Sequence, residues 1–428
     1  MGILAGTLMI LCFFVVVILI MKGESPIIML LLLAIAWAVL AGVPGKNILA
    51  IVLEKGGLAY ASTIVTIIFG AWFGQALVKT GIAESIIRGA IELAGDRPIV
   101  VTMVVSAVTG LLFISLYGVG AAIALGVIAL PIMMSMGVPP HVAAAAYVMP
   151  IGAGTFLNLV DFSIRAPLFP GIKYEQPLLN FFAAAFVVYI LMAWAMAFYH
   201  LRIKGGVRKY SAVSVSPPIS SRPKVPWYAY ISPAIPVVLV IFFKWPMIPA
   251  FILGTCYTLL TTHFGNRTLR ETIDLFHRSF YDAFPDIATI AALWIICGML
   301  IIGGQLPEVQ LVLKPIYSPF LPASRLNLTI FFIVLTPLAI YRGPLHVVGT
   351  GAALIGMFLN AKTFPVMQLF SSWRAAMTVG SSMDPTNSWT LWTLGYTKTT
   401  HKQYLWTGFP WAWLMVAAVT VLAYFMVP

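Results

Sequence analysis

Long apolar runs separated by short polar loops extend along the whole chain. Each run is about 17 to 22 residues long, enough to cross the roughly 30 Å hydrocarbon layer of a bilayer as an α-helix. Examples are Ile3 to Met21, Ile27 to Val43 and Leu178 to His200. Because no soluble domain of useful size fits between the runs, the pattern predicts an all-α polytopic membrane protein embedded in a lipid bilayer.

Two stretches place polar side chains where the apolar pattern puts the chain at bilayer depth. Gly380 to Trp392 reads GSSMDPTNSWTLW, and Ile151 to Arg165 reads IGAGTFLNLVDFSIR, with the helix break expected at Gly152 to Thr155. Polar, broken backbone is tolerated inside a membrane only where protein buries it or where it lines a wet cavity. Two such breaks in matching places of the two halves indicate a substrate site.

Two further interruptions, Ser115 to Gly120 and Tyr341 to His346, lie within long apolar segments. The first segment fits either two full crossings or a re-entrant hairpin whose tip stops near the midplane, and the hairpin is favoured. With hairpins in both halves, each half crosses the membrane five times, so the halves have opposite orientations. The predicted fold is therefore two inverted repeats, each with five spans, a re-entrant hairpin and a broken helix.

A linker rich in serine, proline and basic residues divides the two predicted repeats. The expected boundaries are a first repeat over 1–203 (scaffold helices 1–56, transport part 57–203), a linker over 204–226, and a second repeat over 227–428 (scaffold helices 227–265, transport part 280–428). Most basic residues fall on the linker's side of the membrane in this topology. The positive-inside rule then places the linker in the cytoplasm and both termini outside.

Composition agrees with this interpretation. The chain is 61% hydrophobic and 9% charged, far from the composition of a soluble globular domain. The net charge of +12 would suggest a nucleic-acid partner in a soluble protein, but here the basic residues occupy short loops, so topology explains them and no such partner is expected. Cys12, Cys256 and Cys297 have no paired spacing, and neither a disulfide framework nor a metal site is expected. The predicted location is the inner (plasma) membrane.

Few ionisable side chains remain at bilayer depth once the loop charges are set aside: Asp161, Arg165, Arg342, His346, Arg374 and Asp384. Burying a charge there costs at least about 2.5 to 3.5 kcal/mol, so each is a candidate functional residue. Arg342, at the second tip, can pair a carboxylate bidentately, and His346 can titrate near physiological pH. The alternative is a tip that reaches the interface and leaves both side chains solvated.

The two aspartates have competing interpretations. Asp384 either contacts a coupling cation or proton, or caps the half-helix that follows it, because Asp-Pro-Thr-Asn is good N-cap chemistry. Asp161 is a further candidate for the coupling ion, although Asp161 and Arg165, four residues apart, can simply neutralise each other. Arg374 is expected near an interface. The uncharged positions expected at the substrate site are Tyr117, Gly118, Thr155, Asn158, Ser382, Thr386 and Asn387.

Three segments resemble the ion transporter superfamily, especially its gluconate permease and citrate symporter branches. They are Ile68 to Gly81, reading IFGAWFGQALVKTG, Leu116 to Gly120, reading LYGVG, and Gly380 to Trp389. The resemblance implies a scaffold domain that dimerises and elevator-like transport of organic anions with H⁺ or Na⁺. The chain departs from gluconate permeases at Gly118, where they carry an acidic residue, and both tips lack the Ser-Asn-Thr motifs of divalent-anion symporters.

The sequence therefore predicts a homodimeric secondary active transporter of a small organic anion, with no cofactor other than a transported H⁺ or Na⁺. Arg342 is expected to pair the carboxylate. A cation/proton antiporter that uses Asp161 and Asp384 without an organic substrate is the alternative. An intramembrane enzyme built on His346 and Asp384 is a weaker one, because the chain has no His-Glu-x-x-His, Gly-x-Ser-x-Gly or phosphate-binding motif.

Overall fold

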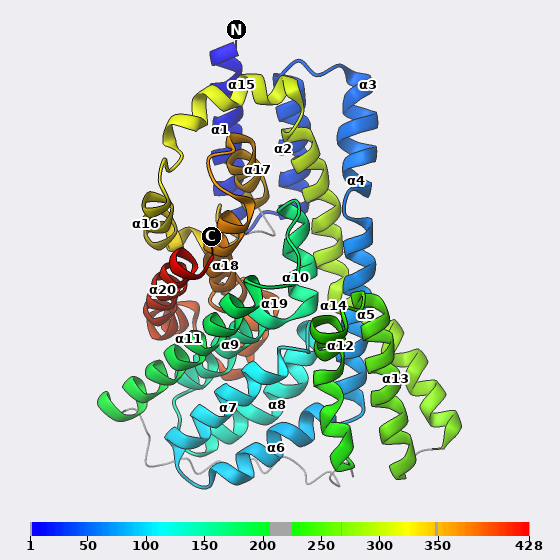
Figure 1. Cartoon of the computed structure of the whole chain (residues 1–428). Helices are drawn as coiled ribbons and strands as arrows, with labels where there is room; N and C mark the ends of the chain where they lie inside the picture. Colours follow the sequence, from blue (N-terminus) through cyan, green and yellow to red (C-terminus); the bar gives the residue numbers. More distant parts are fainter. Residues whose placement is uncertain (1, 206–224, 267, 347–349, 428) are drawn as a thin grey trace.

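The computed structural model (Figure 1) describes residues 2–205, 225–266, 268–346 and 350–427. Over these ranges the regular elements are all helical. Most of the predicted linker lies outside the described residues. The described part confirms the predicted all-α class.

The first half begins with two apolar helices and ends with a long one. Its elements are α1 (Gly2–Met21), α2 (Pro26–Leu40), α3 (Gly45–Asn47), the π-helical η1 (Ile48–Lys55), α4 (Gly56–Leu58), α5 (Ala61–Lys79), α6 (Ile82–Ala94), α7 (Pro98–Leu112), α8 (Val119–Ser135), α9 (Pro140–Leu157), α10 (Leu159–Arg165), η2 (Ala166–Leu168), α11 (Leu178–Phe198) and η3 (Tyr199–Ile203).

The second half has a similar series of elements. They are η4 (Trp227–Ala234), α12 (Ile235–Phe243), α13 (Met247–Asn266), α14 (Leu269–Gly304), α15 (Pro307–Tyr317), η5 (Ser318–Phe320), α16 (Arg325–Leu335), η6 (Thr336–Ala339), α17 (Ala352–Ala361), α18 (Val366–Ser382), α19 (Ser388–Thr397) and α20 (His401–Met426).

The two halves match in the order of their elements, and the helices around their tips lie toward opposite ends of the molecule. In each half, two helices precede a long helix (α5 or α14), and a tip between two helices is followed by a broken helix (α9–α10 or α18–α19). In Figure 1, α6, α7 and α8 lie at the lower end, and α15, α16 and α17 at the upper end. This is the arrangement expected of an inverted repeat, which stays a prediction, as do the division into scaffold and transport parts and the five spans per half.

Several helices are long and apolar enough to cross a membrane. Within the described residues four single stretches qualify: Gly45–Lys79, Leu178–Ile203, Leu269–Gly304 and His401–Met426. Two bent pairs, Pro140–Leu157 with Leu159–Leu168 (74°) and Pro307–Phe320 with Arg325–Ala339 (89°), raise the number to six if each pair is one span. The chain is thus built as a multi-pass membrane protein.

The first helix break lies later than the sequence predicted. Helix α9 continues through Gly152 and Gly154, and the chain bends only at Asn158. These glycines instead allow close packing: a Cβ atom on Gly154 would lie 2.5 Å from the carbonyl oxygen of Gly110, and one on Gly152 would lie 2.8 Å from the Ser382 side chain. Small residues at buried positions let membrane helices approach closely, which explains them without a break.

The long helices α5 and α14 are joined along one face by polar contacts. The Trp72 indole donates a hydrogen bond to the Ser279 hydroxyl (3.0 Å), and one turn further Gln75 bonds to Asp286. Farther on, α4 crosses α14 with backbone contact, because a Cβ atom on Gly56 would lie 2.6 Å from the Cα atom of Met299. The Gln75–Asp286 contact thus joins the two long helices beside the first tip.

Candidate functional site

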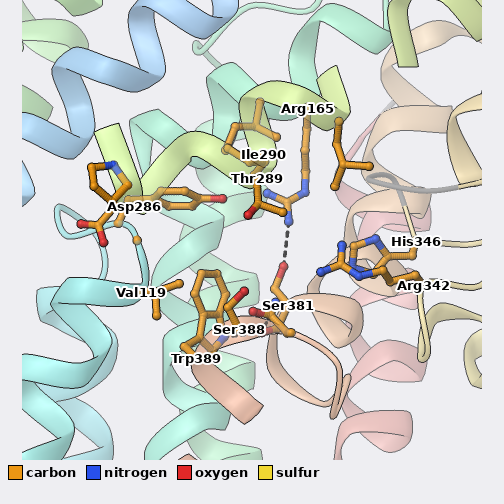
Figure 2. Close-up of a pocket in the computed structure, with 16 residues that line it drawn as sticks. Val119, Arg165, Asp286, Thr289, Ile290, Arg342, His346, Ser381, Ser388 and Trp389 are labelled. Atoms are coloured by element: carbon orange, nitrogen blue, oxygen red, sulfur yellow. Dashed lines mark hydrogen bonds between the residues drawn. The ribbon is translucent and has the colours of Figure 1, made fainter. Parts of the chain in front are cut away.

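Both tips, both helix breaks and α14 meet around a cavity of about 110 Å³ (Figure 2). A space of this size is several times what one water molecule requires. Its wall includes Tyr117, Gly118, Val119, Ile164, Arg165, Asp286, Thr289, Ile290, Arg342, His346, Ser381, Asn387, Ser388 and Trp389.

The first tip is held by the first helix break. The Asn158 side-chain amide donates hydrogen bonds to the carbonyl oxygens of Phe113 and Leu116, both at 2.9 Å. Its oxygen accepts one from the Asp161 backbone N–H at 2.9 Å, which caps α10. Asn158 therefore satisfies the non-helical backbone on both sides of the break, as required at membrane depth, and lies behind the cavity wall.

The second tip is held by the second helix break through a carboxylate. Fully buried Asp384 accepts hydrogen bonds from the backbone N–H of Arg342 (3.0 Å) and from the backbone N–H and hydroxyl of Thr386 (2.8 and 2.7 Å). Tyr341 and Arg342 both have φ of 54°, a left-handed conformation that non-glycine residues rarely adopt. The bond to Asp384 thus fixes a tight turn that carries the Arg342 side chain.

A buried ion cluster begins at the wall with Arg165 and continues behind it. Arg165 pairs with Asp161, and Arg374 pairs with the other Asp161 oxygen at 2.6 Å. The Arg374 side chain is only 1% exposed, and its guanidinium lies 4.9 Å from the centre of the Phe156 ring. The expectation that Arg374 lies near a membrane interface stays a prediction, but its side chain is not solvated, because α18 packs in the interior and turns it toward Asp161. Two cations share one carboxylate, so the cluster carries one excess positive charge.

Several hydrogen-bond donors at the cavity remain unused. Arg342 is only partly buried, and within the described residues its backbone N–H bonds to Asp384 while its guanidinium has no hydrogen bond or ion pair. Nδ1 of His346, a residue that is 9% exposed, has no partner there either. Arg165 donates to the Ser381 hydroxyl at 2.8 Å, whereas its Nε finds no partner in the same part of the chain. Figure 2 shows Arg342 and His346 side by side at one end of the cavity and Arg165 above Ser381. A buried donor without a partner costs free energy, so this wall suits an acceptor with negative charge.

The predicted site residues divide into two groups. Tyr117, Gly118, Arg342, His346 and Asn387 line the cavity. The others are Thr155, Asn158, Asp161, Ser382, Asp384 and Thr386, none of which is on its wall.

Most of that second group make structural hydrogen bonds. The Thr155 hydroxyl donates to the carbonyl of Gly152 (2.7 Å), and the Ser382 hydroxyl donates to that of Thr378 (2.9 Å). The hydroxyl of Tyr189 also bonds to Ser382.

Sequence reasoning missed Asp286, Ser381 and Trp389. Asp286 was left out of the ionisable residues expected at bilayer depth, although it lies two residues inside the apolar run that begins at Phe284. That position was the available signal, and in the structure Asp286 lies in the middle of α14. Trp389 donates its indole N–H to the Ser381 carbonyl at 2.7 Å and packs edge-on against Tyr117.

Comparisons with known proteins bear on the fold. No protein-family model and no curated sequence matches this chain. Among solved structures, the crystal structure of the YdaH transporter from Alcanivorax borkumensis, described as having an unusual topology, matches with a TM-score of 0.61 and 15% identity over 94% of this chain and 98% of that one. The match gives no support to a closer likeness to gluconate permeases or citrate symporters. The chain has the fold of a membrane transporter.

Proposed function

We propose that the protein is a secondary active transporter of a small organic anion that carries a carboxylate, coupled to H⁺ or Na⁺. The observation that carries this proposal is the Arg342 guanidinium, which lines the cavity beside the buried His346 and has no partner among the described residues. A free guanidinium fork binds a carboxylate bidentately. Arg165 on the wall and Arg374 behind it together carry one positive charge more than Asp161, which favours an anion at the same place.

The charges around the cavity support coupling to a cation. Arg165, Arg342 and Arg374 are matched by three carboxylates, Asp161, Asp286 and Asp384, among the described residues at or behind the wall. An anion that entered alone would leave one unbalanced negative charge at bilayer depth, which is costly. A proton or Na⁺ carried with the anion offsets that charge.

His346 is the proposed proton carrier, because its Nδ1 has no hydrogen-bond partner in the part of the chain that the structure describes and the residue lies beside Arg342. Asp384 and Asp161 are less suited to a coupling ion, since protein donors already occupy their oxygens. This also favours anion transport over the cation/proton antiporter. Inverted repeats, an elevator-type motion of the tip-bearing parts, a homodimer, and a cytoplasmic linker with both termini outside complete the proposal.

Thermal stabilisation of the purified protein by carboxylates tests it. Acetate, lactate, succinate, citrate and gluconate would be compared, each with and without Na⁺ and at pH 6 and pH 8, roughly on either side of the ordinary histidine range. A ligand at about 100 times its Kd adds about 2.7 kcal/mol of stability, a readily measured shift in Tm. At least one carboxylate should stabilise the protein, and the same one should be taken up by proteoliposomes.

Arg342→Gln should abolish both the stabilisation and the uptake. Arg278→Gln is the matched control, because Arg278 forms an exposed pair with Asp274 on α14, away from the cavity. Uptake by Arg342→Gln at the rate of the control would remove the carboxylate-pairing role. Na⁺-dependent proton release with no stabilisation by any carboxylate would instead establish the antiporter.

A further inference from the structure

Asp286 is the acidic residue of the cavity wall. It lies on α14, and within the described residues that line the cavity no other side chain is acidic. In Figure 2 it occupies the end opposite Arg342 and His346. A transported carboxylate bound between the two ends therefore meets a cation at one and a carboxylate at the other.

Asp286 also holds the first tip. Its Oδ1 accepts a hydrogen bond from the backbone N–H of Gly120 at 2.9 Å, and its Oδ2 accepts one from the Gln75 amide at 2.5 Å. Gly120 belongs to the first turn of α8, a 17-residue helix that begins at Val119. Backbone N–H groups at such a helix start attract anions, because they point outward without intrahelical partners.

The glycines of the first tip explain how a carboxylate from another helix reaches this position. A Cβ atom on Gly120 would lie 2.8 Å from Oδ1 of Asp286 and 2.7 Å from the Gln75 amide nitrogen. One on Gly118 would lie 3.1 Å from the Asp286 Cβ, at a φ of 104° that side chains rarely adopt. A side chain at either position would occupy the space that the Asp286 carboxylate takes. The two glycines of Tyr-Gly-Val-Gly therefore allow the hydrogen bond between Asp286 and the Gly120 N–H.

The second tip differs in one respect. Its backbone N–H, at Arg342, is also held by a carboxylate, but Asp384 is fully buried behind the wall. Asp286 is half-buried and faces the cavity. Of these two tip-holding carboxylates, Asp286 is thus the one that an entering anion meets.

We propose that Asp286 is an internal competitor of the transported anion. It holds the N-terminus of α8 while the cavity has no anion, and an oxygen of the entering anion, at the end away from Arg342, displaces it from the Gly120 N–H. The inference rests on the proposed function. In this role the negative charge of Asp286 weakens anion binding and so promotes release of the anion. A purely structural Asp286 would hold the tip by its hydrogen bonds, and its charge would not affect anion affinity.

Asp286→Asn tests the charge, because asparagine keeps the shape and an oxygen that accepts from Gly120. Binding of the most stabilising carboxylate among acetate, lactate, succinate, citrate and gluconate would be measured by calorimetry. Two unit charges a few Å apart repel enough, even in water, to weaken binding about fivefold, so we expect Asp286→Asn to bind at least that much more tightly. Asp286→Glu keeps the charge and should bind no more tightly than the wild type.

Asp282→Asn is the matched control, since Asp282 lies one turn earlier on α14, pairs with Lys79 and does not line the cavity. Its affinity should equal that of the wild type. If Asp286→Asn does not fold, Asp286→Ser, which also removes the charge and keeps an acceptor, must give the tighter binding. Unchanged or weaker binding by the charge-free variant overturns the inference and leaves the proposed function standing. Failure of every panel member to bind either protein refutes both.

Discussion

Replacing Asp161 by asparagine should destabilise the protein strongly. Asp161 is 1% exposed and is the carboxylate shared by Arg165 and Arg374. Asparagine fills the same volume, so no void forms, and what changes is that two buried guanidinium groups lose their counter-charge. Removing one partner of a buried ion pair costs about 3 to 5 kcal/mol. At about 2.1 cal/mol/K per residue, the 428 residues translate this cost into a fall in Tm of about 3 to 6 °C.

Arg374→Met provides the comparison that isolates charge. Methionine keeps apolar contact with Phe156, and the remaining Asp161–Arg165 pair is neutral, whereas Asp161→Asn leaves two cations with no anion. The arginine variant should therefore lose clearly less stability than the aspartate variant, although both remove the same 2.6 Å contact.

The assay can use the chain's own thiols. Cys297 is buried, whereas Cys12 and Cys256 are partly exposed. In a Cys12→Ser, Cys256→Ser background, a thiol-reactive dye reports unfolding through Cys297 alone. Asp274→Asn, which breaks the exposed pair with Arg278, is the control and should change Tm little, because exposed helical pairs contribute only a few tenths of a kcal/mol. A Tm of Asp161→Asn equal to that of the control, or above that of Arg374→Met, would refute the reasoning.

Two further predictions concern the tips and the topology. Asn158→Ala removes the side chain that bonds the carbonyls of Phe113 and Leu116 and the N–H of Asp161. Each unsatisfied buried group costs about 1 to 3 kcal/mol, so the Tm of this variant in the same dye assay should fall well below that of Asn360→Ala. Asn360 is the control because its Nδ2 has no hydrogen-bond partner within the described residues. A cysteine at Ser211 should react with membrane-impermeant maleimide only from the cytoplasmic side, and one at Lys173 only from outside; labelling of both from one side would disprove the predicted orientation.

The sequence was informative about where the helices are interrupted. Polar residues in an apolar run located both breaks to within a few residues, because non-helical backbone in a membrane needs polar partners and the chain must supply them locally. The exact bend at Asn158 was missed for a physical reason. Glycine in a membrane helix serves close packing as well as bending, and Gly152 and Gly154 serve packing.

Charge placement was harder to predict, because it depends on which helices pack together. The sequence around Arg374 does not show its partner, and only the packing of α18 against α9 brings it to Asp161. Asp286 acquires its role from contact with a tip 166 residues earlier in the chain. No periodicity within either segment encodes such partners.

The hydrogen bonds in the structure divide the candidate residues into two groups, although in the sequence all of them are alike as polar residues in apolar segments. Every polar group at bilayer depth looked like a candidate ligand, since each is costly there. In the structure, the Asn158 amide donates to backbone carbonyls of the first tip. The Asp384 carboxylate accepts from backbone N–H groups at the second tip and the second break. Arg342 and His346 keep donors that no described residue uses. Asn158 and Asp384 thus stabilise the non-helical backbone, whereas Arg342 and His346 on the second tip lack an acceptor that a bound anion would supply.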